Sequence, residues 1–333
     1  MPTSDVVADA IVDCLVVGGG PAGLTSAIYL GRYFRSVLVV DKGWSRAEWI
    51  PRSHNLPGFP DGVEGPVLLD RMRAQARLYG ARLTSGQVDA LRRSDDGLFI
   101  ADVGAASITA RTVVLATGVV ENKPPLPHVA DAVRQGLIRT CPICDGYESR
   151  GRRIAVMGIG EHAAAEALFL RTYTDQLWLL RPRLAEALAT DTLRALDAAH
   201  IGLIHADIAS VRLGEDGVTA LSADDGAIHS FDVVYSAFGT TSQTQLAKAL
   251  GARMDDANRL YVSEHQETSV EGLFAAGDLV RGLNQIVIAN GEAAIAATAI
   301  HNRLPRKPYG MAIAAPASAA AATAASHSPP KPR

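Results

Sequence analysis

Two stretches of this chain repeat the same order of hydrophobic and polar positions. The first begins with an apolar run at 11–17, passes through a glycine-rich turn at 18–23, and continues into mostly apolar and small residues at 24–31. A short apolar run bounded by glycine predicts a buried β-strand, and the longer segment after it predicts a helix. The pattern therefore indicates a strand, a tight turn and a helix in succession.

The first turn has the form Gly-x-Gly-x-x-Gly. It contains Gly18, Gly20 and Gly23, with Pro21 and Ala22 between the last two glycines. A second apolar run at 37–40 ends in Asp41, eighteen residues after Gly23. At about this distance a Rossmann unit places an acid that binds ribose hydroxyls. Turn, helix and terminal acid together predict a dinucleotide site.

The second stretch begins with an apolar run at 154–157. Its turn, of the form Gly-x-Gly-x-x-Ala, contains Gly158, Gly160 and Ala163. A helix is expected at 164–171 and a strand at 177–180. The position equivalent to Asp41 holds Arg181, and Arg183 follows two residues later. A guanidinium suits a ribose that carries a phosphate; the alternative interpretation is a solvated basic strand end.

Each stretch closes with another apolar strand, at 113–118 and at 233–239. A third element at 273–278 ends in Gly277 and Asp278, and we expect it to rejoin the first domain. The predicted fold class is α/β, with two Rossmann-like, doubly wound domains and the second inserted into the first. The predicted boundaries are 1–123 plus 243–308 for the first domain, 124–242 for the second, and 309–333 for a disordered tail.

The tail prediction rests on composition. Residues 312–326 include ten alanines, and a Pro-rich end follows them, so this segment offers no amphipathic face to bury.

Composition and charge exclude several classes of protein. Of the 333 residues, 48% are hydrophobic and 20% are charged, which is typical of a packed chain and not of a disordered one. With 32 Lys plus Arg against 35 Asp plus Glu, the net charge is −3, so nucleic acid is not expected as a partner. The N-terminus lacks the basic region of a secretory signal, and no apolar stretch is long enough to span a membrane. We expect a cytoplasmic, non-membrane protein.

Only three cysteines occur, and two of them, Cys141 and Cys144, form a Cys-x-x-Cys pair. Two thiols at this spacing can close a small disulfide ring, which favours redox chemistry. A zinc site is the alternative, but no second Cys pair or close His pair completes four ligands, so no metal is expected. Cys14 lies within an apolar strand and is interpreted as a core residue.

Taken together, these motifs resemble those of the low-molecular-weight thioredoxin reductases over about residues 11–304. The shared order comprises the first glycine turn, an Asn-x-Pro-Gly segment that begins at Asn55, the Ala-Thr-Gly strand end, Cys-x-x-Cys-Asp-Gly, the second glycine turn and Ala-Ala-Gly-Asp. No single motif is specific, whereas their order is.

The resemblance implies a flavoprotein, commonly a homodimer, that passes electrons from NADPH through FAD to its Cys pair and then to a thioredoxin-like protein or a small disulfide. The residues implied for FAD are Gly18, Gly20, Pro21, Ala22, Gly23, Asp41, Asn55, Ala116, Thr117, Gly118, Gly277, Asp278 and Gln285. Those implied for NADPH are Gly158, Gly160, Ala163, Arg181 and Arg183.

The resemblance also assigns roles around the Cys pair. Cys144 is the thiol expected against the flavin, and Cys141 is the one expected to attack the partner disulfide. Asp145 is expected to act as the acid-base group for the thiol protons. The alternative for Asp145 is a helix cap or turn residue.

The chain departs from the family pattern at several positions. Glu161 brings a negative charge to the second turn, and Arg181 and Arg183 are what remains of a larger basic cluster. Near the flavin, the family's Arg-Gln-Ala is replaced by Asn-Gln-Ile around Gln285. A donor other than NADPH, such as ferredoxin or a second flavin, therefore stays open.

Two further functions are kept as alternatives. One is a dithiol oxidase that uses oxygen, and the other is a flavin-bound redox sensor without turnover. Trp44 and Trp49 are expected to pack in preference to stacking on a cofactor. Tyr309 has no assigned role.

Overall fold

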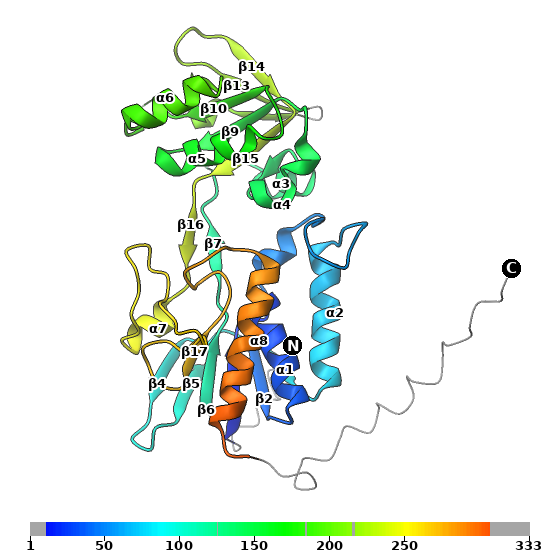
Figure 1. Cartoon of the computed structure of the whole chain (residues 1–333), viewed down its shortest axis with the longest axis vertical. Helices are drawn as coiled ribbons and strands as arrows, with labels where there is room; N and C mark the ends of the chain where they lie inside the picture. The colour runs from blue at the N-terminus through cyan, green and yellow to red at the C-terminus, as the bar shows by residue number, and fades with distance from the viewer. Residues whose placement is uncertain (1–10, 125, 184, 215–216, 307–333) are drawn as a thin grey trace, which may run out of the picture. The chain divides into compact units, whose positions relative to one another are not determined.

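The computed structural model describes residues 11–124, 126–183, 185–214 and 217–306. This part of the chain divides into two compact units, which are described one at a time (Figure 1). Unit 1 contains the described residues of 1–45, 69–118 and 243–333, and unit 2 contains residues 46–68 and the described residues of 119–242. The expected tail and Tyr309 lie outside the described residues.

Unit 1 is built on a sheet that has seven strands over its described residues. The strands are β1 (Val12–Val17), β2 (Val37–Asp41), β3 (Arg82–Ser85), β4 (Ala90–Arg93), β5 (Phe99–Val103), β6 (Ala106–Leu115) and β17 (Leu273–Ala275). Their order is β3-β2-β1-β6-β5-β4, and β17 also pairs with β6. The α-helices of this part of the chain are α1 (Pro21–Arg32), α2 (Gly65–Leu78), α7 (Gln245–Ala249) and α8 (Ile286–Arg303), of which α2 begins in unit 2.

Strand β6 is long enough to have two different partners along one edge. Its first half, 106–110, pairs with β5 in the antiparallel sense, and 113–115 pairs with β17 in the parallel sense. Strands β1, β2, β3, β6 and β17 all run parallel. Their carboxyl ends therefore meet at one edge of the sheet, which is where α/β folds bind ligands.

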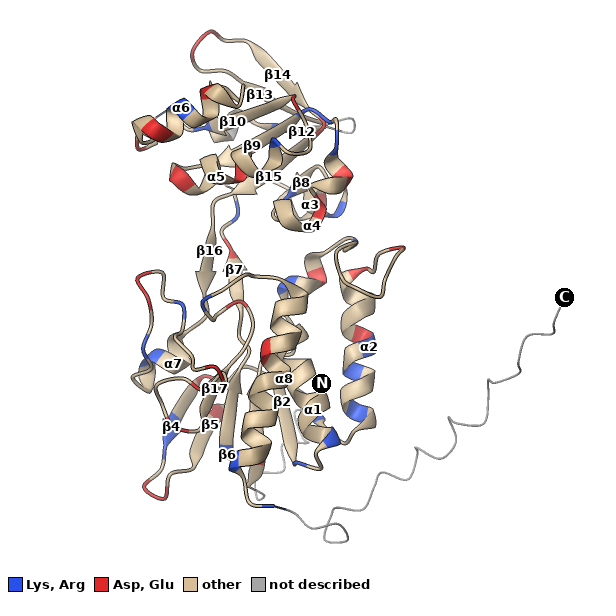
Figure 2. Ribbon diagram, viewed as in Figure 1, with Lys and Arg blue, Asp and Glu red and all other residues tan. Residues whose placement is uncertain are grey.

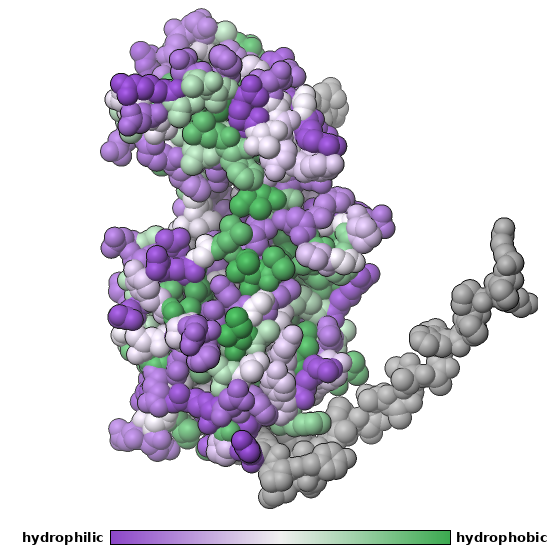
Figure 3. Space-filling view, in the orientation of Figure 1, coloured by the Kyte–Doolittle hydropathy of each residue, from purple (hydrophilic) through white to green (hydrophobic). Residues whose placement is uncertain are grey.

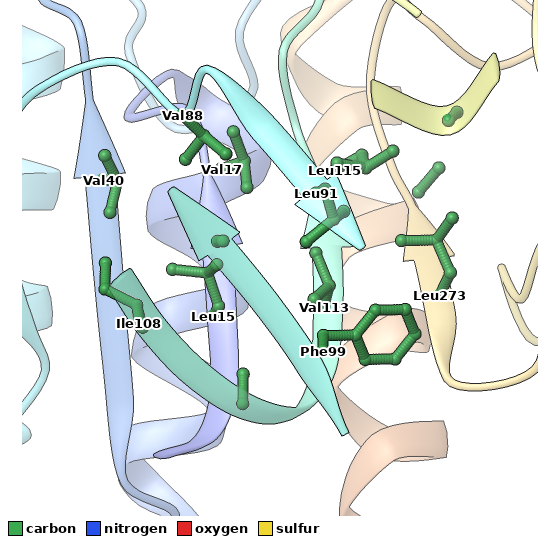
Figure 4. Close-up of a cluster of buried hydrophobic side chains, with 14 of the residues drawn as sticks. Leu15, Val17, Val40, Val88, Leu91, Phe99, Ile108, Val113, Leu115 and Leu273 are labelled. Carbon is green, nitrogen blue, oxygen red and sulfur yellow. The ribbon is translucent and has the colours of Figure 1, made fainter. Parts of the chain in front are cut away.

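The core of unit 1 forms on one face of this sheet. Side chains from neighbouring strands, among them Leu15, Phe99 and Val113, pack together with Leu273 from β17 (Figure 4). Burying an aliphatic or aromatic side chain of this kind contributes about 1.5–3 kcal/mol. A separate cluster of small residues, Ala22, Ala276, Ala289 and Ala293, lies where α1 and α8 approach each other.

Unit 2 contains a parallel sheet with the strand order β11-β10-β9-β15-β8. Its strands are β8 (Ile138–Arg139), β9 (Ile154–Gly158), β10 (Leu177–Arg181), β11 (Gly202–His205) and β15 (Val233–Ala237). An antiparallel sheet consists of β12 (Arg212–Gly214), β13 (Gly217–Leu221) and β14 (Ile228–Phe231), and β7 (Val119–Glu121) pairs with β16 (Thr240–Ser242).

The helices of unit 2 are short. They are α3 (Val129–Arg134), α4 (Pro142–Asp145), α5 (Gly160–Leu170) and α6 (Thr190–Ala198), with 3-10 turns η1 (Arg46–Trp49), η2 (Tyr147–Ser149) and η3 (Ile208–Ser210).

Both faces of the parallel sheet in unit 2 are covered. In β9, Ile154 and Val156 pack with residues of α5 and α6, whereas Ala155 and Met157 pack with residues of the β12–β14 sheet. Successive side chains of a strand point to opposite faces, so a strand buried on both sides shows a continuous apolar run. This explains why the pattern at 154–157 predicts the strand correctly.

The structure confirms the α/β class and the predicted strand-turn-helix order in both units. Helix α5 begins at Gly160, four residues earlier than expected, because the glycine turn itself forms the first turn of the helix. The antiparallel strands β4, β5 and β12–β14 were not predicted. No helix among the described residues is long and apolar enough to cross a bilayer. Acidic and basic residues are interspersed on each unit (Figure 2).

Candidate functional site

The first glycine turn joins the end of β1 to the start of α1, and two of its glycines cannot be replaced. A Cβ on Gly18 would lie 2.3 Å from the carbonyl oxygen of Ala116, and Gly18 has φ +108°. A Cβ on Gly23 would lie 1.9 Å from the carbonyl oxygen of Gly18. Since real Cβ contacts are never this short, only glycine allows the strand, turn and helix to pack this closely.

The N-terminus of α1 is open to an anion. Gly20 is the N-cap, Pro21 opens the helix, and no side chain among the described residues caps the first turn. No acid lies in that turn. Unsatisfied N–H groups and the helix dipole together attract phosphate. Asp41 at the end of β2 lies against this turn, because a Cβ on Gly19 would be 2.3 Å from its Oδ2.

The carboxyl ends of two other parallel strands of unit 1, β6 and β17, are followed by further small or polar groups. Gly277 has φ +88°, and its N–H donates to Oε2 of Glu292 at 2.7 Å. The Thr117 hydroxyl donates to the carbonyl of Gln243 at 2.6 Å. Gln285 is the N-cap of α8. Burial raises the pKa of the Glu292 carboxyl, and the nearby Asp278 raises it further.

These features fit FAD. The turn accepts a pyrophosphate at backbone N–H groups, and Asp41 lies where a ribose would be held. Apart from Asn55, every residue expected to contact FAD belongs to unit 1. Asn55 belongs to unit 2, where its Nδ2 donates to the carbonyl of Ile143 at 3.4 Å and its Oδ1 accepts from Ser53. The structure therefore places Asn55 beside the Cys-x-x-Cys segment.

The second glycine turn in unit 2 repeats the steric arrangement of the first. A Cβ on Gly158 would lie 2.4 Å from the carbonyl oxygen of Ala237 and 2.8 Å from Cβ of Ala163. Gly160 has φ +66°. In both units the first glycine thus faces the carbonyl at the end of the neighbouring strand. The backbone of this turn is compatible with a dinucleotide.

The charged residues around the second turn differ from the expected pattern. Oε1 of Glu161 accepts from the N–H of Ala189 at 2.8 Å, and its other oxygen accepts from the Thr192 hydroxyl. The carboxylate therefore binds the start of α6. Arg181 is buried, and its guanidinium donates to the carbonyl of Glu186. Of the two arginines expected at a ribose phosphate, only Arg183 is exposed.

Glu161 stays negatively charged. The bond from the Ala189 N–H and the bond from the Thr192 hydroxyl both lower the pKa of its carboxyl. An anion in the first turn of α5 opposes the approach of a pyrophosphate, while the glycine backbone favours it.

The Cys pair lies at the short helix α4. Cys141 is its N-cap, and a disulfide joins Cys141 to Cys144 with the two Cα atoms 5.3 Å apart. Pro142 opens the helix with a suitable fixed φ. The N–H of Cys144 donates to Sγ of Cys141 at 3.2 Å. The predicted redox-active disulfide can therefore form with this backbone.

Asp145 directly follows the pair, and side chains from two strands hold its carboxylate. Nη1 of Arg139 on β8 lies 2.8 Å from Oδ2, and the Tyr235 hydroxyl on β15 donates to Oδ1 at 2.8 Å. Ser149 lies 2.9 Å from the same tyrosine hydroxyl. Burial raises the pKa of the Asp145 carboxyl above its ordinary value, and the Arg139 charge and the Tyr235 hydrogen bond offset only part of this rise.

Arg139 and Tyr235 were missed in the sequence. A signal for Tyr235 was present, because a tyrosine within an apolar strand needs a partner for its hydroxyl. Arg139 stands two residues before Cys141 and carries no motif of its own.

The other residues singled out in the sequence lie outside these sites or differ from expectation. Cys14 is fully buried, as predicted, and desolvation raises its pKa to about 12. Trp44 is 80% exposed and Trp49 is 42% exposed, so neither ring is buried in a core as the packing prediction expected. The Trp44 ring lies 5.9 Å from the Lys42 ammonium. No group of three or more His, Cys, Asp or Glu in the described ranges could hold a metal ion.

Comparison with known proteins shows which proteins this chain is similar to. The family described as pyridine nucleotide-disulphide oxidoreductase matches residues 12–293. A thioredoxin reductase of Listeria monocytogenes is 29% identical over 302 residues, which cover 86% of this chain and 92% of the relative. The NADPH-dependent thioredoxin reductase 3 of Arabidopsis thaliana is 30% identical, covering 87% of this chain and 58% of the relative.

A solved structure of a thioredoxin reductase is also similar to this chain. The thioredoxin reductase of Streptococcus pyogenes is 25% identical and superposes with a TM-score of 0.82, covering 88% of this chain and 98% of that structure.

Proposed function

The chain belongs to the pyridine nucleotide-disulphide oxidoreductase family, and we propose that it moves electrons from NADPH, through FAD bound in unit 1, to the Cys141–Cys144 disulfide and then to an external disulfide. It is a thioredoxin reductase-like flavoprotein disulfide oxidoreductase. The observation that carries the proposal is the disulfide itself, formed at the N-terminus of α4 and followed by a carboxylate.

Bound FAD supplies the conversion between a two-electron hydride donor and a dithiol, which no amino-acid side chain can provide. The chain's own contribution is to bind and orient this group. Gly18, Gly20 and Gly23 bring backbone N–H groups to the pyrophosphate, and Asp41 accepts from ribose hydroxyls. Gly277 and Asp278 are proposed for the phosphate and ribityl chain.

The two cysteines have different roles in this proposal. In the reduced protein the N–H of Cys144 can donate to the Cys141 thiolate, which favours ionisation of Cys141. Cys141 therefore attacks one sulfur of the acceptor disulfide, forms a mixed disulfide and expels the other sulfur as a thiolate. Cys144 then attacks Cys141, restores the internal disulfide and releases the second thiolate. Asp145 exchanges protons with these sulfurs.

The division of the chain into an FAD-binding part, 1–123 plus 243–308, and a nicotinamide-binding part, 124–242, is also a proposal. Hydrogen exchange on the full chain tests it. FAD should slow exchange mainly in the first set of residues, and NADPH mainly in the second. Protection by NADPH confined to the first set would contradict this division.

A second candidate is supported by the charges at the second glycine turn. Glu161 and the buried Arg181 weaken the expected phosphate site, so a reductase with another donor is the alternative. Anaerobic addition of NADPH, NADH or a photochemical reductant, followed at the flavin absorbance, separates the two. Reduction by NADPH supports the main proposal, whereas reduction only by the photochemical reductant supports the alternative.

The acceptor is proposed to be a thioredoxin-like protein or a small disulfide. Steady-state turnover with thioredoxin tests this and separates an enzyme from a flavin-bound sensor. A dithiol oxidase would instead consume oxygen while oxidising added dithiols. A polypeptide that is purified colourless and cannot be reconstituted with flavin would overturn all of these candidates.

The homodimer implied by the resemblance stays a prediction. Helix α8 exposes apolar side chains, including Val287, Ile288 and Ile295, and apolar residues gather over this part of unit 1 (Figure 3). Exposed apolar area of this kind is common at subunit interfaces. Light scattering during size-exclusion chromatography gives the mass directly, and a monomer mass of 35.1 kDa would contradict the prediction.

A further inference from the structure

The two side chains that hold Asp145 lie opposite each other on neighbouring strands. Strands β8 and β15 are parallel, and Arg139 and Tyr235 are partners in their register. The guanidinium binds one carboxylate oxygen and the tyrosine hydroxyl binds the other, each at 2.8 Å. The two oxygens of Asp145 are therefore fixed by the sheet and do not depend only on the short helix α4.

This arrangement is expected to add little net stability. The side chains of Arg139 and Asp145 are only 18% and 23% exposed, and the Tyr235 side chain is fully buried. Nε of Arg139 is buried and has no hydrogen-bond partner among the described residues. A buried ion pair is often no more stabilising than apolar residues of similar size, and a buried unpaired donor adds a further cost. Packing alone does not account for the choice of these residues.

We propose that Arg139 and Tyr235 are positioning residues that orient the Asp145 carboxylate next to the Cys pair and stabilise its charged form, so that it can take the proton of Cys144. This inference rests on the proposed disulfide chemistry and on the acid-base role of Asp145. It adds two residues that lie outside both the Cys-x-x-Cys-Asp-Gly segment and the second glycine turn.

The step concerned is the second half of the exchange. Cys141 already carries one sulfur of the acceptor as a mixed disulfide. Asp145 takes the proton from the Cys144 thiol, and the resulting thiolate attacks Sγ of Cys141. The bond between Cys141 and the acceptor sulfur breaks, and that sulfur leaves as a thiolate with the electron pair. The dithiol is oxidised by two electrons, and the acceptor disulfide is reduced by two.

The direction of the effect follows from the groups that face Asp145. Arg139 from β8 and the Tyr235 hydroxyl from β15 lower the pKa of its carboxyl, while burial and Glu148 from η2 raise it. Ser149, also from η2, contacts the tyrosine hydroxyl. Removal of either favourable partner therefore raises the pKa of Asp145. As the pH is lowered, Asp145 is then protonated at a higher pH than in the wild type. The rate of the second half of the exchange therefore starts to decrease at a higher pH.

The test uses the flavin-loaded full chain, reduced with dithiothreitol and freed of it anaerobically. In stopped flow, 5,5′-dithiobis(2-nitrobenzoate) reacts with the dithiol and releases two thionitrobenzoates in sequence. The second release reports attack by Cys144. For Tyr235→Phe we expect the acid side of its pH profile to move up by about half a pH unit or more, and for Arg139→Gln by about one unit or more. Arg139→Lys should restore part of the shift.

Matched controls remove the same groups from two residues of unit 2 that do not bind the Asp145 carboxylate. Tyr173→Phe deletes a hydroxyl from a ring that packs on the same core cluster as Tyr235, and Arg152→Gln deletes an exposed guanidinium. Both should leave the profile unchanged. The variant Asp145→Asn tests whether Tyr235 acts through Asp145. Adding Tyr235→Phe to that variant should cause no further shift of the pH profile. Thermal unfolding of each variant verifies that it is folded.

An unchanged profile in folded Tyr235→Phe and Arg139→Gln, or a shift that persists in the Asp145→Asn background, would overturn the inference. Dithiothreitol reduces the Cys pair directly, and the disulfide probe takes electrons from the pair without the flavin. This test therefore does not depend on electron transfer from the flavin. Failure of the proposed function has a different signature, namely that a reduced flavin does not generate the Cys141–Cys144 dithiol.

Discussion

The N–H of Cys144 donates to Sγ of Cys141 at 3.2 Å, so the first cysteine of the pair receives a hydrogen bond from the second. This bond persists when the disulfide is reduced if α4 keeps its backbone, and it favours a thiolate on Cys141. The local geometry thus supports the order in which the two sulfurs are proposed to act.

Substitution of either cysteine should separate their roles. Cys141→Ser should lower turnover of an external disulfide by about a hundredfold or more, because the attacking sulfur is lost, while the flavin is still reduced. Cys144→Ser should instead accumulate a mixed disulfide between Cys141 and the acceptor, seen as a mass increase without reductant. Normal turnover by Cys141→Ser would remove the proposed mechanism.

Cys14 should be chemically silent. Its pKa is raised to about 12 by burial, so at pH 8 only about one thiol in ten thousand is ionised. Iodoacetamide applied to the reduced, folded protein should therefore label Cys141 and Cys144, and label Cys14 only after denaturation. Peptide mass spectrometry reads the three sites separately, and rapid labelling of Cys14 in the folded protein would contradict its core position.

The first glycine turn should tolerate no side chain at Gly23. Its Cβ would lie 1.9 Å from the Gly18 carbonyl oxygen, so Gly23→Ala should lose most bound FAD or fail to fold. Gly291→Ala is the control, since Gly291 lies within α8 and a Cβ there meets nothing within 4 Å. That variant should keep its flavin and gain up to about 1 kcal/mol of stability. Flavin absorbance per protein and thermal unfolding measure both effects.

Glu292 predicts a pH dependence of stability. Burial raises its folded-state pKa, so the folded protein holds the proton more tightly than the unfolded chain does. The stabilisation is present below the ordinary glutamate pKa and is lost as the pH rises through the raised value. Glu292→Gln should therefore unfold at a higher temperature than wild type at pH 7, and the advantage should shrink towards pH 4. A difference that does not vary with pH would contradict this.

The two arginines at and just after the end of β10, Arg181 and Arg183, should behave differently. Arg183 is exposed, so Arg183→Ala should raise the KM for NADPH by about tenfold while leaving that for NADH nearly unchanged, as expected for loss of a phosphate contact. Arg181 is buried and binds the Glu186 carbonyl, so Arg181→Ala should destabilise the fold by about 1.5–3 kcal/mol. Equal effects on both nucleotides would argue against a role of Arg183 at the ribose phosphate.

The local pattern of apolar and polar residues was sufficient to predict the two repeated strand-turn-helix units. The strands that begin at Val12 and Ile154 are buried on both sides, so their apolar runs predicted them directly. The antiparallel strands such as β13 are short and half-buried, and their pattern could not be distinguished from that of loops.

In the candidate site, too, some residues could be predicted from the sequence and others could not. Sequence alone identified the glycines, because a close backbone approach excludes every other residue, and it identified the Cys pair, because a ring of that size needs only two intervening residues. Tertiary structure decided which charges reach these elements. It buried Arg181 against its own loop, turned Glu161 to the start of α6, and placed Arg139 and Tyr235 on Asp145 across neighbouring strands. The contacts of Glu161 and Tyr235 join residues distant in sequence, and those of Arg181 and Arg139 depend on how a loop or a strand packs, so no local spacing records them.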